Sequence, residues 1–285
     1  MEQKRKRRWR WIAWGSTTIV AVYLGASWWF ARSLVYPART DAVAPNEFTV
    51  ERLDDRTPLW VREAGPAPQV AFVFVHGLKG STHQWIDAAE DLSQEGIPSV
   101  APAMPGHAGS PHEAVGFGPH ESRIVAATAA WARERWPGAK IVLCGVSMGG
   151  AACWLAAQRD PNVADAIVTE SAFAQLDSAI DEWFSRGLGK LGLNVFAPTR
   201  WMANRMAGID PSTVRPVDGA RTWRRPCLVL HAGNDRLLSR QNGEQLAKAA
   251  GVELQVIPGA EHAQGYAADR AAYRDRLLEL ARTIR

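Results

Sequence analysis

The prediction of the fold rests on one stretch of sequence, Ile141-Val142-Leu143-Cys144-Gly145-Val146-Ser147-Met148-Gly149-Gly150-Ala151-Ala152. A short apolar run typical of a β-strand breaks at Gly145, and an Ala-rich helical pattern begins after Ser147. In such a strand–turn–helix context, Gly-x-Ser-x-Gly is typical of a nucleophile elbow, whose serine has a positive φ. The tight turn leaves no room for a Cβ atom at Gly145 or Gly149. The pattern therefore predicts that the Ser147 hydroxyl projects from a sheet edge, at the positive end of the following helix.

The rest of the chain alternates short apolar strands with helical patterns. Strands are expected at residues 47–53, 57–63, 70–75, 98–101, 140–144, 166–170, 227–231 and 253–257. Helices are expected at residues 84–95, 120–136, 148–158, 240–250 and 267–283. With right-handed crossovers, this order builds a mostly parallel sheet with helices on both faces. We therefore expect an α/β fold with an eight-stranded sheet and functional residues at the carboxyl ends of its strands.

A long segment, residues 174–225, interrupts this alternation after the sixth strand. It is too long for an ordinary connection and has helical and Gly-rich pieces of its own, so it predicts a helical lid over the strand ends. Among its large apolar side chains are those of Trp183, Phe184 and Trp201. Such side chains either form a small core within the lid or line an apolar substrate pocket.

The first 46 residues differ in composition from the rest. Residues 1–10 form a basic tail, and residues 11–31 contain no charged residue. At the rise of an α-helix, the length of this apolar stretch matches the hydrocarbon core of a bilayer. Aromatic residues stand at both of its ends, as in interfacial belts, and the basic tail predicts a cytoplasmic N-terminus.

These features predict a single-pass transmembrane helix at 11–31, a linker at 32–46 and a body at 47–285 on the extracytoplasmic side. The main alternatives are a cleaved signal peptide and a buried core helix. Cleavage is disfavoured because Trp28-Trp29-Phe30 stands where a cleavage site needs small residues.

Charge and cysteine usage narrow the class of the protein further. The chain has 285 residues and a net charge of +4, of which the first ten residues carry +5 and the remainder −1. A nucleic-acid-binding surface on the body is therefore not indicated. Three cysteines, Cys144, Cys153 and Cys227, fall in apolar segments without metal-ligand spacing, and we expect them to be buried thiols.

The order of elements resembles that of the α/β-hydrolase superfamily, and the resemblance covers residues 47–285. In that superfamily an acid after a late strand and a histidine before the last helix follow the nucleophile in this order. Leu228-Val229-Leu230-His231-Ala232-Gly233-Asn234-Asp235 and Val256-Ile257-Pro258-Gly259-Ala260-Glu261-His262 match these two places. The resemblance therefore implies a triad of Ser147, Asp235 and His262, in which the imidazole takes the serine proton and the carboxylate orients the imidazole. Glu170, at the end of the preceding strand, is the reserve acid.

The resemblance also implies an oxyanion hole formed by two backbone N–H groups. One belongs to Met148, the residue after the nucleophile, and the other to Leu78, in the loop after His76-Gly77. The turn Pro105-Gly106-His107-Ala108-Gly109-Ser110 resembles the superfamily's Pro-Gly-x-Gly-x-Ser turn, but its second glycine is shifted and the usual preceding Asp is missing. This departure weakens any inference about the substrate from that turn.

Four histidines also lie close together in sequence: His83, His107, His112 and His120. Because acidic partners at ligand spacing are missing, we expect solvated loop histidines rather than a metal site.

The resemblance implies a membrane-anchored serine hydrolase of carboxylic esters or thioesters, similar to lysophospholipases and esterases, that needs no metal or cofactor. An anchor beside an apolar lid favours lipid-like or other hydrophobic esters as substrates. Hydrolysis of amide or carbon–carbon bonds uses similar triads and stays open, as does a non-catalytic ligand-binding or sensing module on the same fold. A scaffold that binds anionic lipid through its tail would leave the elbow unexplained.

Overall fold

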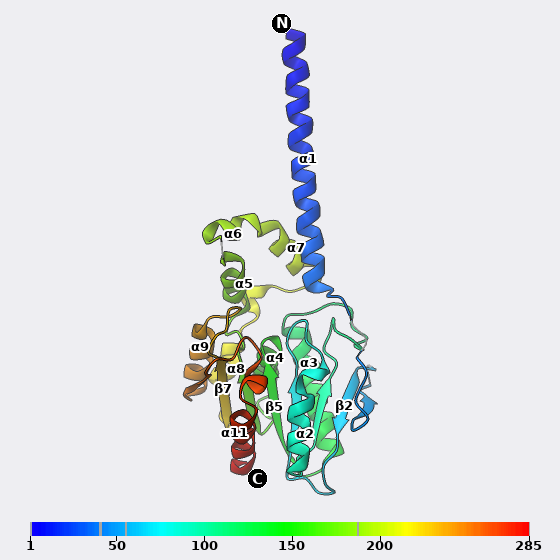
Figure 1. Cartoon of the computed structure of the whole chain (residues 1–285), viewed down its shortest axis with the longest axis vertical. Helices are drawn as coiled ribbons and strands as arrows, with labels where there is room; N and C mark the ends of the chain where they lie inside the picture. The colour runs from blue at the N-terminus through cyan, green and yellow to red at the C-terminus, as the bar shows by residue number, and fades with distance from the viewer. Residues whose placement is uncertain (1, 40–41, 55, 187, 285) are drawn as a thin grey trace.

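The computed structural model describes residues 2–39, 42–54, 56–186 and 188–284, and in this part of the chain eight strands form one sheet (Figure 1). The strands are β1 (Thr49–Arg52), β2 (Pro58–Arg62), β3 (Val70–Val75), β4 (Ser99–Pro102), β5 (Lys140–Val146), β6 (Ala166–Glu170), β7 (Cys227–Ala232) and β8 (Leu254–Ile257). Their order across the sheet is β1-β2-β4-β3-β5-β6-β7-β8. β2 runs antiparallel to β1 and β4, and the other neighbouring pairs are parallel. The carboxyl ends of the parallel strands therefore meet at one edge of the sheet.

Helices cover both faces of the sheet, which is why the central strands read as continuous apolar runs. One face packs against α3 (Pro119–Arg135), α4 (Met148–Arg159), α8 (Pro216–Thr222) and α9 (Arg240–Ala250). The other face packs against α2 (Ile86–Gln94) and α11 (Arg270–Thr283). Two short helices, η1 (Thr82–Trp85) and α10 (Gly265–Ala268), precede α2 and α11.

Helices α5, α6 and α7, between β6 and β7, stand clear of the sheet above its carboxyl edge (Figure 1). We call α5 (Leu176–Ser185), α6 (Lys190–Val195) and α7 (Ala197–Ala207) the outer lid. After them come η2 (Pro211–Thr213) and α8. Helix α8 packs on α4 so closely that a Cβ atom on Gly219 would lie 2.0 Å from the carbonyl oxygen of Trp154. The end of the segment at 174–225 therefore joins the helical cover of the sheet.

Helix α1 (Glu2–Val35) extends away from the body as one long helix (Figure 1). Among the described helices, it is long and apolar enough to cross a membrane by its length and composition. It continues past Ala31, the expected end of the apolar helix, because the next helix breaker is Pro37 and because its last turn packs on the outer lid. Ala31 and Val35 are fully buried against α7.

The α/β class and the eight-stranded, mostly parallel sheet predicted from the sequence are confirmed. The differences concern the ends of elements. The helix expected at 267–283 is divided into α10 and α11, because the Asp269 side chain caps α11 by accepting the Ala272 N–H. The helix expected at 84–95 begins as η1 and continues as α2.

Candidate active site

Ser147 lies at the turn between β5 and α4. Its φ is 52°, in the left-handed region that residues with a side chain rarely adopt. A Cβ atom on Gly149 would lie 2.4 Å from the carbonyl oxygen of Val75, and one on Gly145 would lie 2.6 Å from the backbone of Gly149. The close backbone approach therefore requires both glycines, and it holds the serine in its strained conformation.

Three side chains from separate strand ends meet at this turn. The Oγ atom of Ser147 lies 2.8 Å from Nε2 of His262, and Nδ1 of His262 lies 2.7 Å from Oδ2 of Asp235. Asp235 follows β7 and His262 follows β8, so the parallel sheet itself brings both residues to the edge where β5 ends. The three residues singled out in the sequence are thus joined by a continuous chain of hydrogen bonds.

Asp235 is held as a carboxylate by its surroundings. Burial alone would raise its pKa, but hydrogen bonding and charge attraction from His262 and the backbone N–H groups of Leu238 and Leu237 outweigh burial and lower the pKa. The two N–H groups donate to Oδ1 at 2.9 and 2.8 Å, which leaves Oδ2 for His262. The acid is therefore fixed in both charge and orientation.

Leu78 and Met148 lie beside Ser147 in the wall of the same cavity. Met148 is the first residue of α4, where backbone N–H groups have no acceptor within the helix. Leu78 follows Gly77, where a Cβ atom would lie only 3.2 Å from Cβ of Ser147. The loop after β3 thus passes directly against the elbow.

Two buried histidines support this loop. Nε2 of His107 accepts the N–H of Lys79 at 2.8 Å, and Nε2 of His76 accepts the N–H of Met104 at 3.3 Å. Burial is the main cause that lowers the pKa of both rings, to about 3 for His76, so both are neutral and able to accept. The expectation that His107 is a solvated loop histidine is wrong, because its side chain is 4% exposed and is used to brace the loop next to Leu78.

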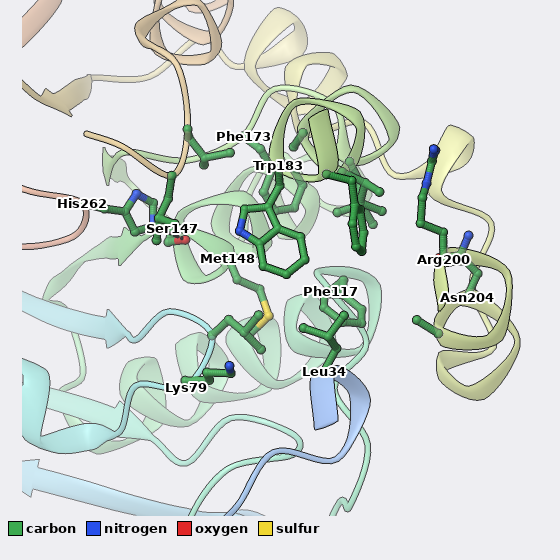
Figure 2. Close-up of a pocket in the computed structure, with 18 residues that line it drawn as sticks. Leu34, Lys79, Phe117, Ser147, Met148, Phe173, Trp183, Arg200, Asn204 and His262 are labelled. Atoms are coloured by element: carbon green, nitrogen blue, oxygen red, sulfur yellow. Dashed lines mark hydrogen bonds between the residues drawn. The ribbon is translucent and has the colours of Figure 1, made fainter. Parts of the chain in front are cut away.

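The cavity above Ser147 has a volume of about 330 Å³ and is mostly apolar. Its lining includes Leu78, Met148 and Phe173 of the body, Trp183 and Phe184 of the outer lid, and Leu34 of α1. Figure 2 shows Trp183 between Ser147 on one side and Leu34 and α7 on the other. Arg200 and Asn204 line the end farthest from Ser147, and Arg200 is paired with Asp181.

The aromatic residues singled out in the lid have different surroundings. Trp183 and Phe184 line the cavity and touch each other, with ring centroids 4.7 Å apart. Trp201 does not line it, since its side chain lies on another face of α7 and is 66% exposed. Leu34, Phe117 and Asn204 line the cavity but were not singled out, and no sequence pattern marks them as neighbours of Ser147.

Glu170, at the end of β6, lies against the loop that follows His262. Its buried carboxyl accepts the N–H of Gly265 at 2.8 Å. Burial raises its pKa to about 7, although the Gly265 N–H opposes this shift. Asp235, not Glu170, makes the hydrogen bond to His262.

The remaining titratable residues do not form a metal site in the described part of the chain, where no three His, Cys, Asp or Glu side chains are gathered as ligands would be. Of the histidines in that sequence cluster, His83 and His112 are exposed and His120 is half-buried. The cysteines are buried, as expected from the sequence.

The comparisons with known proteins agree with the architecture. The family model of the alpha/beta hydrolase fold matches residues 70–205, which include Ser147 but neither Asp235 nor His262. None of the proteins with curated descriptions matches the sequence.

Solved structures extend the likeness over most of the chain. An esterase from Pyrococcus furiosus has a TM-score of 0.70 and 17% identity over 88% of this chain and 98% of its own. An esterase from the Planctomycetes species Thermogutta terrifontis has a TM-score of 0.60 and 20% identity, covering 85% of this chain and 94% of its own. The enol-lactonase from Burkholderia xenovorans has a TM-score of 0.58 and 17% identity, covering 81% and 99%. The chain therefore has the α/β-hydrolase fold.

Proposed function

We propose that the protein is a membrane-anchored serine hydrolase that cleaves carboxylic esters or thioesters through an acyl-enzyme on Ser147. The observation that carries this proposal is the chain of hydrogen bonds from Ser147 through His262 to Asp235, at the wall of an apolar cavity. A module that only binds a ligand has no need for these three side chains in this order. The esterase and lactonase neighbours share the fold and are consistent with ester chemistry.

In the first step, Oγ of Ser147 attacks the ester carbonyl while its proton passes to Nε2 of His262. A serine hydroxyl is a weak nucleophile, and the imidazole 2.8 Å away supplies the base that it needs. The carboxylate of Asp235 holds Nδ1 in its protonated form and stabilises the imidazolium that forms.

The carbonyl oxygen becomes negative in this step and accepts hydrogen bonds from the backbone N–H groups of Leu78 and Met148. Such donors contribute most when they are fixed before the reaction, and the braces from His107 and His76 fix the loop that carries Leu78. The imidazolium then gives its proton to the alcohol or thiol, the bond to this leaving group breaks, and the acyl group stays on Ser147. In the second step, His262 takes a proton from water, which attacks the acyl carbon. The bond to Oγ of Ser147 then breaks, the acid is released, and the imidazolium returns its proton to Oγ.

The cavity favours hydrophobic substrates. Its wall is built from aliphatic and aromatic side chains, and each methylene that leaves water for such a wall contributes about 0.8 kcal/mol. Ser147 and His262 lie at one end and Arg200 and Asn204 at the other, and Lys79 also lines the cavity. An ester with an apolar acyl chain fits this distribution.

Helix α1 would anchor the hydrolase in a membrane. Its residues 11–31 give about 30 Å of apolar helix, the thickness of a hydrocarbon core. The basic residues before Trp11 would stay in the cytoplasm and place the body on the extracytoplasmic side. Extraction of membranes with alkaline carbonate tests the anchor, since release of the protein into the supernatant would contradict it.

A fluorophosphonate probe tests the chemistry. We expect the full chain to be labelled and Ser147→Ala to lose the label, while Ser178→Ala, on the exposed side of α5, keeps it. A wild-type protein that never labels would favour the ligand-binding alternative. Turnover of matched ester, thioester and amide substrates then decides which bond is cleaved.

A further inference from the structure

Large apolar side chains are exposed on and around α6, in and beside the outer lid. The exposed fractions are 51% for Leu188, 61% for Leu191, 38% for Val195 and 66% for Trp201. Leu188, Leu191 and Val195 lie within eight consecutive residues, and exposed apolar side chains gathered on a surface are typical of a contact with a partner or a membrane. In Figure 1, α6 and α7 lie at the end of the body from which α1 emerges.

The outer lid is fastened to α1 itself. The Tyr23 hydroxyl donates a hydrogen bond to the carbonyl oxygen of Val195 at 2.5 Å. Phe30 lies seven residues after Tyr23 on α1, toward the body. Its ring packs against those of Trp183, Phe184 and Phe196, with ring centroids 5.9 to 6.3 Å apart. These contacts fix the height of α6 along α1.

That height lies within the apolar stretch of α1. Tyr23 is five residues, or about 8 Å, farther from the body than Trp28, which begins the aromatic belt at that end of the stretch. If the membrane ended at Tyr23, residues 11–22 would provide only about 18 Å of apolar helix, well short of a hydrocarbon core. The bilayer must therefore extend past Tyr23 toward the body, to the level at which α6 sits.

The charge of α6, α7 and the residues beside them suits the same position, whereas α5 carries Asp177, Asp181 and Glu182. Residues 183–209 contain Arg186, Lys190, Arg200 and Arg205 and no acidic residue. Arg186 and Arg200 are paired with acidic residues of α5, whereas Lys190 and Arg205 are exposed. Long basic side chains beside apolar ones can reach lipid phosphates while their neighbours enter the acyl region.

We propose that α6 and the exposed apolar side chains around it are immersed in the body-side leaflet of the membrane that α1 crosses. Lipid acyl chains cover Leu188, Leu191 and Trp201, at the depth of about 5–10 Å that is typical of interfacial helices. The far end of the cavity, at Leu34, Arg200 and Asn204, then faces this leaflet, and ester substrates enter from it rather than from water. This inference rests on the membrane anchor of the proposed function but not on the hydrolytic chemistry.

The depth of the outer lid can be measured with single cysteine variants of the full chain. Cys144, Cys153 and Cys227 are buried, and burial raises the pKa of each thiol, so a thiol-reactive fluorophore labels an introduced cysteine selectively. The variants are Leu191→Cys on α6, Val20→Cys in the apolar stretch of α1, and Gln94→Cys, at the exposed end of α2, as the aqueous control. Each is placed in vesicles of phosphatidylcholine with some phosphatidylglycerol.

A spin label on the upper acyl chain of the lipid should quench the fluorophore at residue 191 several-fold more strongly than that at residue 94, and aqueous iodide should do the reverse. Quenching of residue 20 by lipid but not of residue 191 would overturn the proposal and leave the anchor intact. Residue 191 shielded from both quenchers would also overturn it, in favour of a protein partner or a second copy. If residue 20 is quenched by iodide, both the anchor and the immersed lid are wrong.

Discussion

At the scale of single residues, the carboxylate of Asp235 is the group whose charge the site depends on most directly. Asp235→Asn keeps the size of the side chain but removes the negative charge that keeps Nδ1 of His262 protonated and stabilises the imidazolium. We expect turnover to fall by about 10⁴, as it does on loss of the equivalent charge in another serine hydrolase, with unchanged circular dichroism. Asp210→Asn, an exposed cap of η2, is the control and should keep full turnover. Near-normal activity of Asp235→Asn would transfer the role of the acid to Glu170.

The raised pKa of Glu170 predicts that the stability of the protein depends on pH. Its folded pKa, about 7, lies above its ordinary value of 4.5, so its contribution to stability is full below about pH 4.5 and is lost as pH rises through about 7. Glu170→Gln keeps an acceptor for Gly265 and removes the titration. Between about pH 5 and 8 the wild type should lose up to about 3 kcal/mol of unfolding free energy that the variant retains. Chemical unfolding in detergent measures this, with exposed Glu113→Gln as the control; equal slopes would contradict it.

Among the site residues, those marked by a backbone constraint could be predicted from the sequence, and those recruited by packing could not. Gly-x-Ser-x-Gly indicates a local turn. Asp235 and His262 each follow the end of a strand, which indicates that they lie at the same edge of a parallel sheet. His107 gives no such signal, because its role arises when the turn after β4 folds back onto Lys79. The roles of the triad and of the two N–H donors stay predictions until activity is measured.

At the scale of elements, the central strands β3, β5 and β6 were predictable because burial on both faces leaves a continuous apolar run at each of them, whereas β1 is mostly exposed and reads only as an alternating run. The ends of helices were less so, because caps such as that of Asp269 depend on one side chain. The division of the segment at 174–225 was not predictable, since both α7 and α8 carry apolar faces. Only the folded structure shows that α8 packs on α4 and that α7 packs on α1.

The strand–turn–helix element makes a prediction about stability. A Cβ atom on Gly149 would overlap the carbonyl oxygens of Val75 and His76, at 2.4 and 2.6 Å, and backbone cannot move aside cheaply. Gly149→Ala should therefore lower the free energy of unfolding by about 3 kcal/mol or more, or prevent folding. Gly251→Ala is the control: its φ is +73° but its Cβ would meet open space, so strain alone should cost about 1–2 kcal/mol. Thermal unfolding compares them, and equal losses would show that close approach is not the constraint.

At the scale of the whole molecule, α1 is both a proposed anchor and a wall of the cavity. The sequence gives the length and polarity of this helix, but it does not reveal that the helix packs on the outer lid. That contact brings Leu34 into the lining of the cavity, although Leu34 and Ser147 are far apart in the chain. The shape of the substrate cavity is therefore expected to depend on a helix that a soluble truncation would remove.

This dependence is testable without removing α1. Leu34→Trp should fill the end of the cavity and shift the preferred p-nitrophenyl ester to a shorter acyl chain. Each methylene that no longer fits costs about 0.8 kcal/mol, or about fourfold in kcat/KM, so esters longer than the new optimum should lose activity stepwise while short esters keep it. Leu24→Trp adds the same ring to α1 at a side chain that is 40% exposed and does not line the cavity, so its chain-length profile should match the wild type. An unchanged profile in Leu34→Trp would mean that the acyl chain leaves the cavity by another side and that α1 acts only as a tether.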